Sequence, residues 1–144
     1  MTWVAVTPST PAETSADGIA WYSNPQPIGA MAIAYGGGTF VTVYGTPSYS
    51  TAATSSDGIT WTTQTIPLPA TGEWLSLGYG GGVFLTVAGG NQDNSAATSP
   101  DGVTWTAQTL PATLSWAGVA YGAGTFVTVG QVNSMGTGGT NVAA

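Results

Sequence analysis

The sequence predicts an all-β fold built from repeated antiparallel units. Two short motifs each occur three times, in a fixed alternating order. The segments between them are rich in Val, Thr, Ile and aromatic residues, which favour strands. Gly-rich and Asp-Gly turns separate those segments. No stretch shows a sustained 3.6-residue apolar period, so helices are expected to be few or absent.

The first motif is an Asp-Gly-x-x-Trp turn that begins at residues 17, 57 and 101, at spacings of 40 and 44 residues. The carboxylate can accept backbone N–H groups across the turn, and Gly can adopt the left-handed conformation. The Trp ring can pack between neighbouring sheets. We therefore expect a structural turn at each copy. Its residues are Asp17, Gly18, Trp21, Asp57, Gly58, Trp61, Asp101, Gly102 and Trp105.

The second motif is Tyr-Gly-x-Gly-x-Phe, beginning at Tyr35, Tyr79 and Tyr121. Together the motifs predict four strands in each full unit. The first strand leads into the Tyr, the second follows the Gly-rich turn, the third precedes the Asp turn, and the fourth starts at its Trp and ends toward a Pro. Examples are 116–121, 126–129, 52–55 and 96–99, and the segments ending toward Pro67 and Pro111.

The two ends of the sequence hold partial units. The chain begins on a second strand (3–6), followed by a third (near 13–15) and a fourth (from Trp21). It ends with a first, a second and a weak third strand near 140–143. The prediction is 14 strands, or about three and a half units of roughly 40–44 residues.

A period near forty with four strands per unit is typical of a β-propeller blade. One small sheet cannot bury both faces, so the units must stack face to face. We expect one repeat domain, 1–144, divided into 1–29, 30–73, 74–115 and 116–144. Propellers usually hold four to eight blades. Either a small ring closes with two three-stranded blades, or another copy completes the open ends. The need to cover apolar faces and unpaired edges favours assembly.

Ser56-Asp57-Gly58-Ile59-Thr60-Trp61, and the matching run from Pro100 to Trp105, resemble the Asp-box, or BNR repeat, of sialidases and related β-propellers. With the Tyr-Gly-Gly-Gly-x-Phe segments, the pattern also resembles repeats in bacterial surface proteins and phage structural proteins. This version is one residue shorter than the usual box, and Ala20 stands where Thr is expected. The resemblance implies a structural turn on the outer face, away from any active site. Sialidase activity is not expected, because that family holds its substrate carboxylate with arginines and this chain has none.

Composition excludes many chemistries. The 144 residues include six acids but no Lys, Arg, His or Cys, for a net charge of −6. Catalytic triads, Schiff-base lysines, zinc, haem and iron–sulfur sites cannot be built from this inventory, so no cofactor or metal is expected. Nucleic acids and anionic membranes are not expected partners, since both attract basic side chains. The N-terminal residues show no secretory signal pattern, and no apolar run approaches 18 residues.

Three acids lie outside the motifs: Glu13, Glu73 and Asp93. Hydrolysis of a glycoside uses two carboxylates, but these three occupy non-equivalent positions and are expected to be solvated surface acids. Asp93 lies in an Asn-rich loop that could ligate calcium, although a single carboxylate favours a plain polar turn. Tyr22, Tyr44 and Tyr49 also lie outside the repeated Tyr motif, and with Asp93 they are the candidates for ligand contacts.

The sequence therefore predicts a non-enzymatic structural or decoration protein of an extracellular assembly, above all a phage virion component. Its expected location is a virion or an extracellular surface, and its expected partners are other copies of itself or other assembly proteins. The first alternative is a carbohydrate-binding, lectin-like module, because six Trp residues could offer sugar-stacking surfaces. Core packing of those rings is the favoured interpretation. The second alternative is a small glycoside hydrolase.

Overall fold

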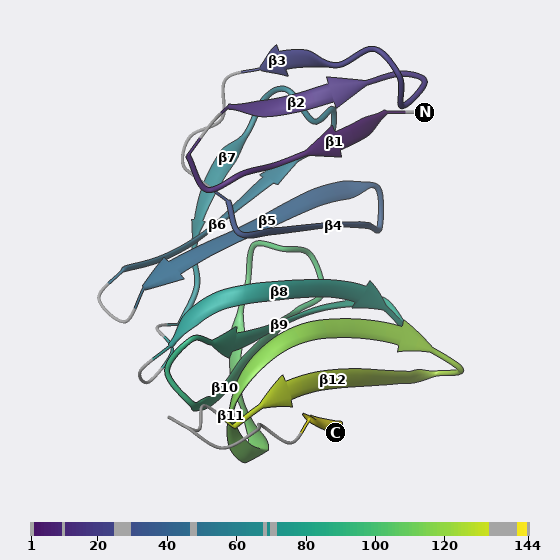
Figure 1. Ribbon diagram of the computed structural model, residues 1–144. Helices are drawn as coiled ribbons and strands as arrows, with labels where there is room; N and C mark the ends of the chain where they lie inside the picture. Colours follow the sequence, from purple (N-terminus) through teal and green to yellow (C-terminus); the bar gives the residue numbers. More distant parts are fainter. Residues whose placement is uncertain are drawn as a thin grey trace.

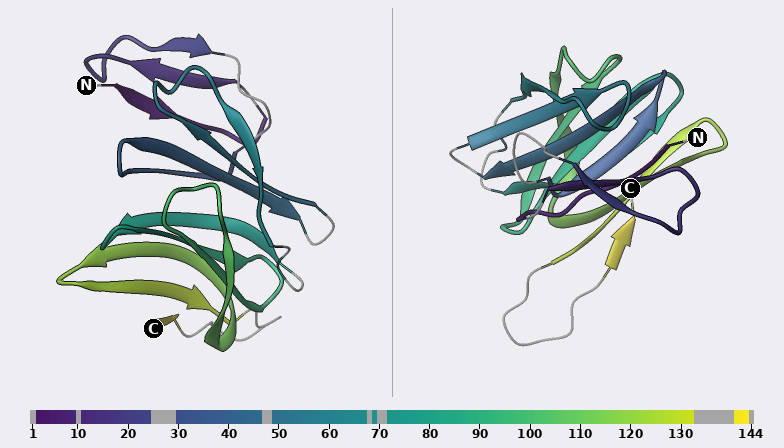
Figure 2. Two further views of the ribbon diagram at one scale, coloured as in Figure 1. Left: turned by 180° about the vertical axis from the view of Figure 1, so that it is seen from behind. Right: turned by 90° about the horizontal axis from the view of Figure 1, so that it is seen from above.

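The computed structural model describes residues 2–9, 11–24, 30–46, 49–67, 69, 72–132 and 141–143. These ranges contain thirteen strands in three antiparallel sheets and no helix, which confirms the all-β prediction. The sheets stack in chain order, with the first sheet at one end and β12 at the other (Figures 1 and 2). None of the described segments forms a helix that is long and apolar enough to cross a bilayer.

The first two sheets are meanders in which consecutive strands are neighbours. The first consists of β1 (Trp3–Ala5), β2 (Ala12–Ser15) and β3 (Tyr22–Asn24). The second consists of β4 (Ala32–Gly36), β5 (Thr39–Thr46), β6 (Tyr49–Ser55) and β7 (Thr62–Thr65). The Gly-rich motif turns β4 into β5, with positive φ at Gly37 and Gly38, a conformation that Gly adopts without steric cost.

The third sheet has the strand order β13-β12-β11-β10-β9-β8. Its strands are β8 (Glu73–Gly80), β9 (Val83–Gly89), β10 (Asp93–Ser99), β11 (Thr106–Gly122), β12 (Thr125–Gln131) and β13 (Asn141–Ala143). The weak strand expected near 140–143 corresponds to β13, and Thr140 lies outside the described residues.

The long strand β11 joins two parts of this sheet. Its first part pairs with β10, and its second part pairs with β12. The prediction that a strand ends toward Pro111 is wrong, because β11 continues through this residue. In the pairing of β10 with β11, Thr109 lies opposite Ser95 and Leu114 lies opposite Asp93. Residues 110–113, which lie between Thr109 and Leu114, are paired with neither β10 nor β12. Pro111 therefore occupies an irregular segment where its missing N–H removes no ladder hydrogen bond.

The apolar core lies between the stacked layers. One cluster joins the second sheet to β8–β10, and includes Val41, Val43, Trp74, Leu77 and Phe84. A second cluster joins β9 and β10 to β11 and includes Leu85, Val87, Ala96, Leu114 and Trp116. Because successive side chains of a strand point to opposite faces, Phe84 belongs to the first cluster and its neighbour Leu85 to the second.

The Trp residues do not all behave alike. Trp74 and Trp116 are fully buried, and Trp105 packs against the first core cluster. Trp3 and Trp21 are 48% and 40% exposed. The expectation that the Trp of each Asp turn packs between sheets is therefore wrong for Trp21, since this turn belongs to the first sheet and the structure describes no layer beyond it.

Candidate functional site

The three Asp turns have the same hydrogen-bond geometry. In each, a Ser hydroxyl two residues before the Asp donates to its Oδ1, at 3.0 Å for Ser15, 2.9 Å for Ser55 and 3.1 Å for Ser99. The same hydroxyl accepts the N–H of the turn Gly at 2.8 Å in every copy. Oδ1 also accepts the N–H groups of the two residues after the Gly, at 2.8 to 3.0 Å.

These donors stabilise the ionised carboxylate. The N–H groups of Thr60 and Ile59, followed by the Ser55 hydroxyl, lower the pKa of Asp57 to about 2. The pKa of Asp17 is lowered chiefly by the N–H groups of the two residues after Gly18, and that of Asp101 by the corresponding pair after Gly102. A carboxylate held ionised in this way is poorly suited to donate a proton near neutral pH. The geometry gives all three acids a turn-forming role.

The Ser at the centre of each turn was not among the predicted site residues. Ser15, Ser55 and Ser99 contribute one hydroxyl that contacts both the Asp and the Gly. Their recurrence two residues before each Asp was the signal that could have identified them. The hydroxyl both donates and accepts, so Ala at this position would remove the acceptor of the Gly N–H and one of the donors to the Asp carboxylate, which keeps its two backbone N–H donors.

The turn Gly and Trp complete the motif. Gly18, Gly58 and Gly102 have φ of 79°, 80° and 76°. The indole Nε1 of the following Trp donates to the Gly carbonyl at 3.2, 3.2 and 2.9 Å.

Two of these turns also fit against the preceding sheet. A Cβ at Gly58 would lie 2.6 Å from Val4 Cγ2, and a Cβ at Gly102 would lie 2.5 Å from Val41 Cγ2. Val4 and Val41 occupy equivalent positions on β1 and β5. Each of these turns therefore closes its own hairpin and also packs on the sheet before it.

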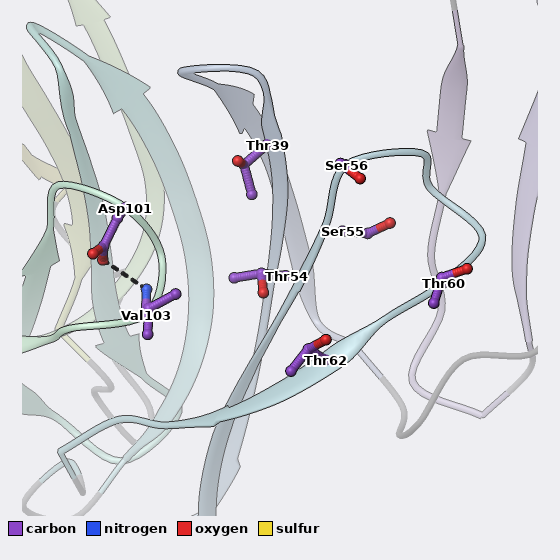
Figure 3. Close-up of a pocket in the computed structure, with 8 residues that line it drawn as sticks. All are labelled: Thr39, Thr54, Ser55, Ser56, Thr60, Thr62, Asp101 and Val103. Atoms are coloured by element: carbon purple, nitrogen blue, oxygen red, sulfur yellow. Dashed lines mark hydrogen bonds between the residues drawn. The ribbon is translucent and has the colours of Figure 1, made fainter.

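A cleft lies beside each of these two contacts. Figure 3 shows the one between the Asp101 turn and the second sheet, with a volume of about 360 Å³. It is lined by Thr39, Thr54, Ser55, Ser56, Thr60, Thr62, Asp101 and Val103. The equivalent cleft between the Asp57 turn and the first sheet measures about 240 Å³. It is lined by Thr2, Thr14, Ser15, Ala16, Tyr22, Asp57 and Ile59.

The tyrosine candidates separate into two places. Tyr22 is exposed and lines the smaller cleft beside Asp57. Tyr44 and Tyr49 contact each other at the β5–β6 hairpin, with ring centroids 6.3 Å apart, and line neither cleft. Of the predicted contact residues, Tyr22 is the one that the structure places beside an Asp turn.

Asp93 requires a correction. Its side chain is only 2% exposed, so the expectation of a solvated acid is wrong here. Its Oδ2 accepts the N–H of Gly72 at 2.8 Å and its Oδ1 accepts the N–H of Ser95 at 2.6 Å. Burial is tolerated because hydrogen bonds compensate the carboxylate for lost water. Asp93 thereby ties the start of β10 to the residue before β8.

The other two acids are placed differently. Glu73 begins β8, next to the Gly72 that Asp93 holds, whereas Glu13 is exposed on β2 in the first sheet. The structure therefore brings Asp93 near the start of β8 and leaves Glu13 in another layer. Within the described ranges, no group of three or more His, Cys, Asp or Glu side chains is placed to hold a metal ion.

A comparison with models of known protein families finds no match, and a comparison with curated protein sequences finds none either. The features that bear on function are therefore the three turns, the stacked sheets and the two clefts.

Proposed function

We propose that this protein is a non-enzymatic structural module of an extracellular assembly, with a phage virion component as the most concrete form. One observation carries the proposal: the Asp turns of two units make the same packing contact with the sheet before them. The Gly58 turn packs on β1 and the Gly102 turn packs on β5 in the same manner. A contact that one chain repeats between its own layers is suited to continue between molecules.

A second recurring contact supports the same proposal. The ring of Tyr79 lies so close to Gly36 that a methyl group there would overlap it, and Tyr121 lies in the same way on Gly80. Each Tyr also pairs with a Phe across its own hairpin, with ring centroids 4.5 to 4.8 Å apart. The motif residues therefore join the second sheet to β8 of the third sheet, and β8 to the second part of β11 within the third sheet.

The finer fold assignment belongs to this proposal. We propose that the layers are blades of a propeller-like arrangement with about three and a half units. The four consecutive antiparallel strands of the second sheet are the layout of one blade. We also propose a relation of these turns to the Asp-box, which rests on the recurring spacing of Asp, Gly and Trp in the sequence.

An extracellular setting suits the surface chemistry. The chain has no Lys or Arg and therefore offers no trypsin-type cleavage site. The assembly role is tested by light scattering of the purified protein from low to high micromolar concentration, with electron microscopy of the same samples. We expect a mass well above the 14.3 kDa of one chain. A stable monomer throughout this range would contradict the proposal.

Carbohydrate binding is the second candidate, favoured by the two equivalent clefts. Both combine hydroxyl groups with one carboxylate, and the smaller adds the exposed Tyr22 ring. Hydroxyl and carboxylate groups can hydrogen-bond sugar hydroxyls while an aromatic face stacks on the ring. By contrast, a glycoside hydrolase gains no support from Asp93, whose two oxygens both accept backbone N–H groups.

A glycan array tests this candidate directly. Binding should weaken in Tyr22→Ala and persist in Tyr49→Ala, because Tyr49 is also exposed but lines neither cleft. Circular dichroism would establish that both variants are folded. Absence of binding by the folded wild-type protein would remove the candidate.

A further inference from the structure

Among the residues that the structure describes, none forms a layer over the face of β12 that points away from β9. In the internal layers, the equivalent side chains are buried beneath the next layer: Val41 and Val43 are 0% exposed, and Leu85 and Val87 are 8% and 0% exposed. On β12 the corresponding Val127 and Val129 are 44% and 48% exposed. Local sequence is nearly the same at the three positions, so the difference comes from the missing neighbour. Figure 1 places β12 at the end of the stack.

The opposite end of the stack presents the complementary surface. Gly58 and Gly102 are buried against the preceding sheet, whereas Gly18 is exposed. The atom nearest to a Cβ built on Gly18 is Nε1 of Trp3, in its own sheet, at 3.9 Å. The Asp17 turn nevertheless has the same internal hydrogen bonds as the other two. It is a preformed copy of a turn that elsewhere docks on a sheet.

Next to the uncovered face, the size of the residue at one recurring position agrees with this pairing. Trp74 lies over Gly45, where a Cβ would come within 2.7 Å of its ring. In the unit of the first sheet, the position equivalent to Gly45 is Pro8. The residue that takes the place of Trp74 there is Ala30, which donates its N–H to the Thr7 carbonyl. At β12 this position is Gln131, beside a hollow of about 340 Å³. Because Gln131 has a side chain where Gly45 has none, the uncovered face is suited to a sheet that places no Trp over this position.

The first sheet of a second copy meets this requirement. Its described strands are β1, β2 and β3, and none of these three is equivalent to β8, the strand that carries Trp74. We propose that a second copy of this chain places its Asp17 turn on the Val127–Val129 face. The contact would repeat between molecules the packing of Gly58 on Val4 and of Gly102 on Val41. This inference rests on the proposed assembly role and specifies its partner and surfaces.

The two surfaces differ, so the association is head-to-tail. They lie at opposite ends of the stack in both Figure 1 and the rear view of Figure 2. Each added copy leaves one surface of each kind open, which produces a ring if the rotation closes and a filament if it does not. With a net charge of −6 and no basic side chain, copies repel one another at long range. Added salt should therefore strengthen this association, because it screens that repulsion.

Thiol cross-linking tests the pairing, since the chain has no Cys of its own. The variants Val127→Cys and Ile19→Cys are mixed and treated with a short bismaleimide. The residues equivalent to Ile19, namely Ile59 and Val103, face the preceding sheet in the two clefts. We expect a covalent dimer that contains one chain of each variant. The matched control replaces Ile19→Cys by Val103→Cys, an exposed turn position whose docking surface is already occupied, and it should give little product with Val127→Cys.

Each outcome has a distinct meaning. Cross-links mainly between two Val127→Cys chains would overturn the head-to-tail arrangement in favour of a symmetric dimer. An oligomer by light scattering without the mixed product would overturn these surfaces and leave the assembly role standing. A monomer at all concentrations would overturn both.

A second measurement uses charge. Val129→Asp should weaken association by about tenfold or more, because a carboxylate would be buried in an apolar contact. The control Val103→Asp should leave association unchanged, and both sites are exposed in the single chain, so folding should persist. Equal association of the two variants in sedimentation velocity would contradict the proposal.

Discussion

The contact between Gly80 of β8 and Tyr121 of β11 allows a quantitative test of how these two strands of the third sheet are packed together. Gly80 ends β8, and a methyl group added there would overlap the Tyr121 ring. Gly122 follows Tyr121 in the same motif, and a Cβ added there would have no atom within 4 Å. Neither Gly has a positive φ, so Gly80→Ala and Gly122→Ala differ in packing and not in backbone strain.

The expected magnitudes follow from these surroundings. Replacing Gly by Ala within a strand should stabilise by about 0.5–1 kcal/mol when space is available, which is the expectation for Gly122→Ala. At Gly80 the ring must move or β8 and β11 must separate, and overpacking of this kind costs about 1–3 kcal/mol. Displacing Tyr121 would also disturb its contact with Phe126, whose ring centroid lies 4.8 Å away. The two variants should therefore differ by about 1–3 kcal/mol in free energy of unfolding, with Gly80→Ala the less stable.

Urea denaturation followed by Trp fluorescence measures this difference, at a protein concentration where light scattering finds the same oligomeric state for both variants. The midpoint should fall for Gly80→Ala and stay constant or rise for Gly122→Ala, with similar slopes. Gly36→Ala should resemble Gly80→Ala, since Tyr79 occupies the equivalent position over it. Equal midpoints for Gly80→Ala and Gly122→Ala would refute the idea that Tyr121 packing on Gly80 holds β8 and the second part of β11 together.

Three further predictions concern the turns. Ser99→Ala should lower the free energy of unfolding by about 1–3 kcal/mol, because the buried Gly102 N–H loses its acceptor. Ser15→Ala, in the exposed turn, should lower the free energy of unfolding by less. Equal losses for the two variants in urea denaturation would contradict this reasoning. The pKa of Asp57 falls from 3.8 to about 2 on folding, so its stabilising effect is complete above pH 3.8 and is lost as the pH falls toward 2. Asp57→Asn should therefore show a shallower decline of Tm in this range, and a decline as steep as that of the wild type would count against a role for the carboxylate. Because all three turn acids have lowered pKa values, the folded protein keeps its negative charge to a lower pH and should be least soluble below the sequence pI of 4.1. A turbidity maximum at or above pH 4.1 would contradict this prediction.

The sequence by itself determined the all-β class and the positions of the turns. These features are local: Asp57 bonds to groups two and three residues away, and the Trp61 indole bonds three residues back. A short segment therefore contains all the groups that form the turn. The role of Ser55 was local as well, and its recurrence in the repeat could have revealed it.

Only the tertiary structure decided which equivalent residues are buried. Burial of Asp93 is tolerated because Gly72, 21 residues earlier in the chain, donates its N–H to the carboxylate. Pro111 lies within β11 because that strand crosses from one ladder to the next. Val43 and Val129 occupy the same place in the repeated motif, yet one is covered by a layer and the other is not. Repetition of sequence fixes each hairpin through bonds within a few residues, whereas burial depends on the layer stacked against it, which the hairpin itself does not contain.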